Sequence, residues 1–145
     1  MKDYPENIGK QINSILEKNI YAQQGFDKAS KHTDNLSLAE YFRSLSAERK
    51  KFIKELRAEL IYFKGEYEET GTADDGGWVD FKSIFTSDDE SMLEEYIRGE
   101  KEALKEYDET CRPDQLPETT TYVLRTQYDK IQSGLIEVNS IEDLQ

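Results

Sequence analysis

The sequence is poor in cysteine and in long apolar stretches, and each lack excludes a class of protein. Its 145 residues hold one cysteine, Cys111, so an intramolecular disulfide framework is excluded. A chain of this kind is simplest to place in a reducing cytoplasm. No apolar run approaches the length of a transmembrane helix, and the first residues, MKDYPENIGK, lack the apolar core of a signal peptide. We therefore expect a cytoplasmic protein with no membrane partner.

Basic residues are also scarce. The 19 lysines and arginines are outnumbered by 31 aspartates and glutamates, which gives a net charge of −12. Binding to nucleic acid requires a basic surface that neutralises phosphates, so no nucleic-acid partner is expected. The partners that remain open are a second copy of the chain, in a homo-oligomer, or another protein.

Aromatic residues, in contrast, are plentiful, with nine tyrosines, six phenylalanines and one tryptophan. Apolar residues recur at helical spacing in four segments, near residues 5–31, 38–64, 88–111 and 117–138. Residues 1–145 are long enough for one domain with a buried core. The pattern predicts an all-α protein made of four long helices.

The connections between these segments differ in length. The first and last are short, whereas about 24 residues separate the second and third helices. That long segment contains WVDFKSIF, which predicts a short helix packed on the others. One long crossover between two helical hairpins is the ferritin-like form of an up-down four-helix bundle.

Short motifs predict where two helices begin and one ends. Ser37 with Glu40, and Ser87 with Glu90, have the spacing of capping boxes, in which a hydroxyl and a carboxylate satisfy free N–H groups. Gly65 is suited to end the second helix, because it tolerates the left-handed conformation.

Each predicted helix carries one polar residue in the middle of its apolar stripe. These four residues are Asn19, Arg49, Glu100 and Gln127. A buried carboxylate loses its solvation unless it is paired, and a guanidinium can bind it through two parallel hydrogen bonds. We therefore expect an Arg49–Glu100 pair, with the two amides satisfying the remaining donors and acceptors. Gly99 would let another group approach the third helix closely.

Three interpretations of this layer remain open. It can be a structural network that fixes the register of the helices, or it can be a functional site. In the third interpretation a rotation of the second helix takes Arg49 out to solvent, and no layer forms.

The same residues argue against a ferritin-type metal site. Di-iron bundles use four carboxylates and two histidines, with two Glu-x-x-His motifs. This chain has one histidine, His32, at the predicted end of the first helix, and no Glu-x-x-His. We expect no metal, no cofactor and no catalytic residue, with Cys111 an inert thiol even though Arg112 adjoins it. A weak carboxylate site, for example at Glu94 and Glu95, remains an alternative.

Three stretches also resemble a known family. AERKKFIKELRAEL, GGWVDFKSIF and RGEKEALKEY, in this order, resemble the PA2169-type four-helix-bundle proteins, also called the DUF2383 domain, in the ferritin-like superfamily. The resemblance extends over residues 26–127. The motif positions are Arg49, Trp78, Lys82, Gly99, Glu100 and Tyr107. The resemblance implies a ferritin-like bundle and brings no established activity.

Two functions follow as hypotheses. The first is a non-enzymatic binding, assembly or stress-related module with a metal-free polar core. Trp78 and Phe81 in the crossover would then form an interaction surface, or else cover the protein's own core. The second is a metal-handling protein or oxidoreductase with an unconventional carboxylate site.

Overall fold

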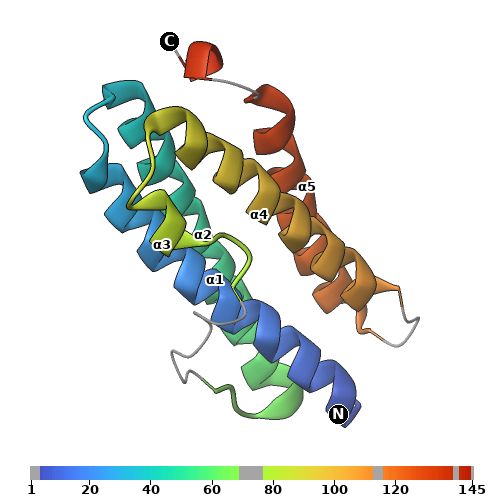
Figure 1. The fold of residues 1–145 in the computed structure, drawn as a ribbon. Helices are drawn as coiled ribbons and strands as arrows, with labels where there is room; N and C mark the ends of the chain where they lie inside the picture. Colours follow the sequence, from blue (N-terminus) through green and yellow to red (C-terminus); the bar gives the residue numbers. More distant parts are fainter. Residues whose placement is uncertain (1–3, 69–76, 113–115, 139–140, 145) are drawn as a thin grey trace.

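The computed structural model describes residues 4–68, 77–112, 116–138 and 141–144. Four long helices dominate it, as Figure 1 shows: α1 (Glu6–His32), α2 (Leu36–Lys64), α4 (Asp89–Cys111) and α5 (Glu118–Glu137). The short helix α3 (Phe81–Ile84) precedes α4, and a 3-10 turn, η2 (Ile141–Leu144), follows α5. The predicted all-α arrangement is therefore confirmed, including the short helix between the second and third long helices. The glycine-rich part of the crossover, residues 69–76, lies outside the described residues.

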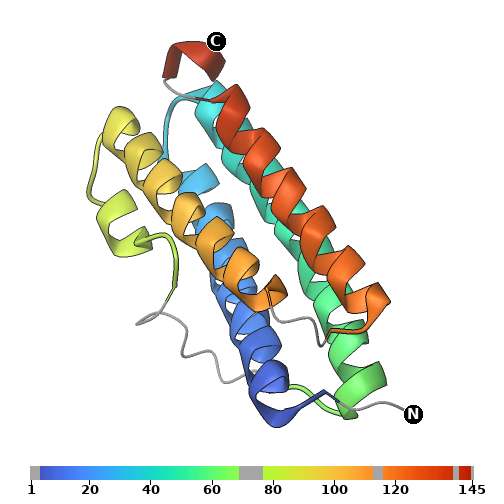
Figure 2. The ribbon, with the colours of Figure 1, turned by 90° about the vertical axis from the view of Figure 1, so that its right-hand side faces the viewer.

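The long helices form two hairpins. α1 packs on α2 and α4 packs on α5, while α1 also lies beside α4 and α2 beside α5 (Figure 2). α2 and α4 run in the same direction, and α1 and α5 run opposite to them (Figure 1). A hydrogen bond of 2.7 Å from Thr33 Oγ1 to Asp89 Oδ1 ties the α1–α2 turn to the start of α4. In the described part of the chain, no helix is long and apolar enough to cross a membrane.

Two helix starts differ from the predicted capping boxes. The Asn35 side chain accepts from Leu38 N at 3.1 Å, and the Asp88 side chain accepts from Ser91 N at 2.8 Å. Asn35 and Asp88, rather than Ser37 and Ser87, are therefore the capping residues. The sequence places an Asn or Asp close to each predicted serine, and all three residue types cap about equally well. Gly65 ends α2 as predicted, with φ of +83°.

The buried side chains form two apolar clusters stacked along the bundle. On α1, α2 and α4, the change from one cluster to the other falls at Asn19, Arg49 and Glu100, all of which are fully buried. A polar layer thus separates two apolar halves of one core.

The crossover is packed tightly against α1 and α4. Trp78 and Phe81 are buried, with 5% and 2% of their surfaces exposed. This burial speaks against the predicted interaction surface and supports the alternative, a cover over the protein's own core. Gly99 makes the close approach possible, because a Cβ atom there would lie 2.4 Å from Val79 Cγ2 and 2.7 Å from Val79 Cα. At Gly25 of α1, a Cβ would likewise overlap the Phe81 ring.

Candidate functional site

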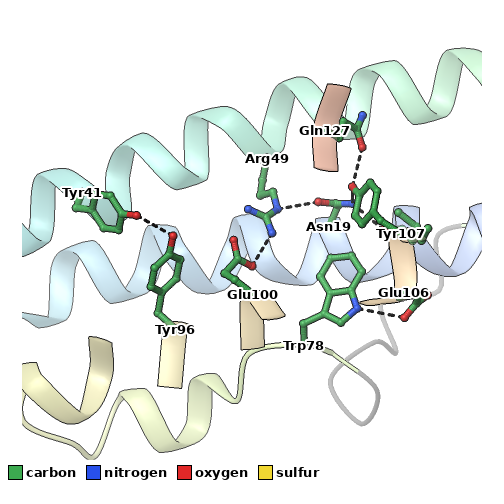
Figure 3. Close-up of polar contacts among 10 residues, drawn as sticks. Asn19, Tyr41, Arg49, Trp78, Tyr96, Glu100, Glu106, Tyr107 and Gln127 are labelled. Carbon is green, nitrogen blue, oxygen red and sulfur yellow. Dashed lines mark hydrogen bonds and ion pairs between the residues drawn. The ribbon is translucent and has the colours of Figure 1, made fainter. Parts of the chain in front are cut away.

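An ion pair lies at the centre of the polar layer. Arg49 Nη2 of α2 donates to Glu100 Oε1 of α4 at 2.6 Å, and both side chains are shielded from solvent (Figure 3). The guanidinium carbon lies 5.5 Å from the ring centroids of both Phe26 and Phe52. These rings confine the cation, so Arg49 has not turned out to solvent. The pair therefore links the two hairpins through the middle of the core.

The pair has one direct hydrogen bond instead of the two that a bidentate contact would give. Arg49 Nε donates to Asn19 Oδ1 at 2.8 Å, so this edge of the guanidinium is directed to α1 and not to Glu100. The expected bidentate geometry is wrong, because Arg49 Nη1 and Glu100 Oε2 make no hydrogen bond with each other.

A hydrogen-bond chain continues from Asn19 to α5. Asn19 Nδ2 donates to Tyr107 Oη at 2.9 Å, and Tyr107 Oη donates to Gln127 Oε1 at 2.6 Å (Figure 3). Gln127 Nε2 then donates to Glu55 Oε1 at 3.0 Å, at the half-buried edge of the bundle. The four predicted polar residues, one from each long helix, thus belong to one network. Tyr107 connects Asn19 to Gln127 within it.

The electrostatics of the pair favour a charged guanidinium. Burial alone lowers the pKa of the Arg49 guanidinium, but the charge and hydrogen bond of Glu100 outweigh this and raise that pKa overall. A guanidinium that stays protonated in the core places a fixed positive charge there. The centre of the bundle is therefore a compensated ion pair and not an anionic cage.

Sequence reasoning missed three polar groups around the network. Glu55 and Glu106 lie outside the apolar stripes, where the sequence predicts side chains exposed to solvent. In the structure Glu106 Oε1 accepts from Trp78 Nε1 at 3.1 Å and also pairs with Lys18. Tyr41 is not part of the predicted polar layer, yet its hydroxyl lies 2.7 Å from that of Tyr96. No spacing rule reveals these contacts, because each depends on how neighbouring helices are rotated.

The buried tyrosines limit the stability of the fold at alkaline pH. Burial raises the pKa of both Tyr4 and Tyr41 to about 12, and it raises the pKa of Tyr96 and Tyr107 as well. The pKa in an unfolded chain is about 10. A folded state that holds these phenols neutral is at full stability below that pH, and it loses stability as pH rises through about 12.

We expect helix content and tyrosinate absorbance to change together in an alkaline titration. Tyr122→Phe removes a hydroxyl on a side chain that is 72% exposed, so it should leave the helix transition in place. Titration of all nine tyrosines near the unfolded pKa of about 10 with the helices intact would contradict the expectation.

The residues present do not fit a di-iron centre. Within the described ranges Glu100 is the one carboxylate that is fully buried, and Arg49 occupies the position beside it where a cation would bind. His32 lies at the end of α1, with its ring centroid 5.8 Å from that of Phe85. Among the described residues, no three histidine, cysteine, aspartate or glutamate side chains gather as a metal-ligand group.

The other candidate side chains are the carboxylates Glu94 and Glu95 and the thiol Cys111. Glu95 accepts from Arg98 Nη2 at 2.6 Å and from Asp80 N at 2.7 Å, while Glu94 is exposed. Burial raises the pKa of the Cys111 thiol. Arg112 does not activate this thiol, because its guanidinium binds Asp108.

Comparisons with known proteins agree with this architecture. Residues 7–112 match the family model of DUF2383, a domain of unknown function, and no curated protein matches the chain. Among solved structures, the chain is similar to the bacterioferritin-related protein from Bacteroides fragilis, which is described as a dodecameric thioferritin. The TM-score is 0.73 at 14% identity, over 99% of this chain and 85% of that one. A likeness at this identity shows the fold, which is ferritin-like as predicted.

Proposed function

This chain belongs to the DUF2383 family, and from that premise we propose that it is a non-enzymatic bundle with a metal-free polar core that works through binding or self-assembly. The observation that carries the proposal is the buried Arg49–Glu100 pair, with its contact of 2.6 Å. A divalent cation beside Glu100 would meet the guanidinium at close range in a medium that screens charge poorly. Oε1 of this carboxylate is already engaged by that guanidinium.

The exposed apolar side chains support self-assembly. In the described part of the chain, the large hydrophobic residues that are exposed all belong to α2, to the segment just after it, or to α5: Leu36, Ile61, Tyr62, Tyr67, Tyr122 and Ile136. The crossover lies on the opposite side of the bundle, away from α5 (Figure 2). Contact between copies through α2 and α5 would therefore cover apolar surface without displacing the crossover.

Charge opposes this assembly and makes it depend on salt. Each copy carries a net charge of −12, so copies repel each other at low ionic strength. Salt at physiological concentration limits the range of this repulsion to about 8 Å. We therefore expect the apolar contacts to prevail at physiological salt.

Native mass spectrometry of the purified protein, after incubation with Fe(II), Mn(II) or Zn(II), tests both parts of the proposal. We expect a mass that is a multiple of the 16.9 kDa chain and that carries no stoichiometric metal. A monomer under all salt conditions would contradict the assembly. Stoichiometric metal would contradict the metal-free core if Glu100→Gln abolishes the binding. Loss of binding in His32→Ala instead would place the metal at the surface and leave the core proposal intact.

A further inference from the structure

Two polar atoms of the central ion pair have no hydrogen-bond partner among the described residues. These atoms are Arg49 Nη1 and Glu100 Oε2, and both are inaccessible to solvent. Arg49 Nη2 and Glu100 Oε1 already bond to each other at 2.6 Å, and Arg49 Nε is directed to Asn19. One donor group and one acceptor thus remain on the same buried pair. Figure 3 shows the second carboxylate oxygen on the side of the pair where Tyr96 lies.

Buried polar groups without a hydrogen-bond partner are rare in native proteins. More than nine in ten buried polar groups have a partner, either in the protein or in an ordered water. Such waters occur about once per 27 residues, at sites that offer two to four polar partners. The ring centroids of Phe26 and Phe52 lie 5.5 Å from the guanidinium carbon, so apolar rings take up part of the space around Arg49.

We propose that one structural water binds between Arg49 Nη1 and Glu100 Oε2 and bridges α2 to α4. It accepts a hydrogen bond from Nη1 and donates one to Oε2. With the direct contact between Nη2 and Oε1, it closes a ring that replaces the second bond of a bidentate pair. The water supplies a partner to both Arg49 Nη1 and Glu100 Oε2, the two atoms of the pair that lack one among the described residues.

The chemistry of the two atoms selects a neutral molecule. An anion at Nη1 would meet the carboxylate, and a cation at Oε2 would meet the guanidinium. Only a small molecule that both accepts and donates satisfies the two atoms. The inference rests on the proposed metal-free core, but it can fail separately from it.

A crystal structure at a resolution that shows ordered waters tests the proposal directly. We expect a density peak of water size within about 2.7–3.2 Å of both atoms. A direct bond between Nη1 and Oε2, or no peak, would overturn the water and leave the metal-free core standing. A peak with anomalous scattering from a metal would overturn both.

Magnetic relaxation dispersion of water deuterons tests it in solution. The double variant Arg49→Met/Glu100→Leu removes both polar groups and should lose one long-lived water relative to wild type. Lys31→Met/Asp27→Leu, a matched change at an exposed ion pair of α1, should lose none. Equal numbers in wild type and the central double variant would overturn the proposal. The crystallographic test needs no variant and decides the question if the double variant does not fold.

Discussion

Replacing Arg49 with alanine is expected to lower the free energy of unfolding by about 3–5 kcal/mol in urea denaturation. The substitution leaves the Glu100 carboxyl group buried in the core without its partner. It also removes the donor to Asn19 Oδ1 and the packing against Phe26 and Phe52. Glu100→Ala should have an effect of similar size, because it strands the guanidinium instead.

Three controls separate the ion pair from a general loss of packing. Arg49→Met/Glu100→Leu removes both charges, so it should be about as stable as wild type or more stable by up to about 4 kcal/mol. Arg112→Ala breaks an exposed pair with Asp108, and it should change stability by no more than about 1 kcal/mol. In a double-mutant cycle, the Arg49→Ala and Glu100→Ala effects should depart from additivity by at least about 1 kcal/mol. Simple additivity would mean that the two groups do not interact.

Gly99→Ala is expected to destabilise the protein by about 1–3 kcal/mol, although alanine is the better helix former. A Cβ atom would lie 2.7 Å from Val79 Cα and 2.8 Å from Trp78 O, which are backbone atoms that no rotamer change can move away. The crossover must therefore shift outward. Trp78 is the one tryptophan of the chain, so its fluorescence should move to longer wavelength as the ring becomes hydrated.

Gly9→Ala provides the matched control on α1. There the nearest atom to an added Cβ would be Lys64 Cδ at 3.3 Å, in a flexible side chain. We expect no loss of stability and a gain of up to about 1 kcal/mol from helix propensity. A Gly99→Ala variant that behaves like Gly9→Ala, with unchanged Trp78 emission, would show that the crossover is not seated on Gly99.

The sequence was sufficient to predict the helices and the members of the polar layer, for a physical reason. Helical periodicity fixes which face of each helix is buried, and a polar residue in that face stands out against its apolar neighbours. Asn19, Arg49, Glu100 and Gln127 are therefore identified one helix at a time. Their positions near the middle of each helix then predict that they meet.

The contacts within the layer could not be predicted in the same way. Whether Arg49 gives one bond or two to Glu100 depends on how the two side chains are oriented in the packed core, and spacing along the chain carries no such orientation. The same limit applies to the Tyr41–Tyr96 contact. Trp78 and Phe81 posed a different problem, because an aromatic residue in a crossover suits an external contact as well as an internal one. Only the docked position of the crossover on Gly25 and Gly99 decides between them.

The packing of the crossover also joins the two hairpins of the bundle. The short helix α3 of the crossover lies against both α1 and α4, which belong to different hairpins. A second segment, η2, contacts α2 of one hairpin and α4 of the other. Because α3 and η2 each contact both hairpins, separating the hairpins requires both segments to be displaced.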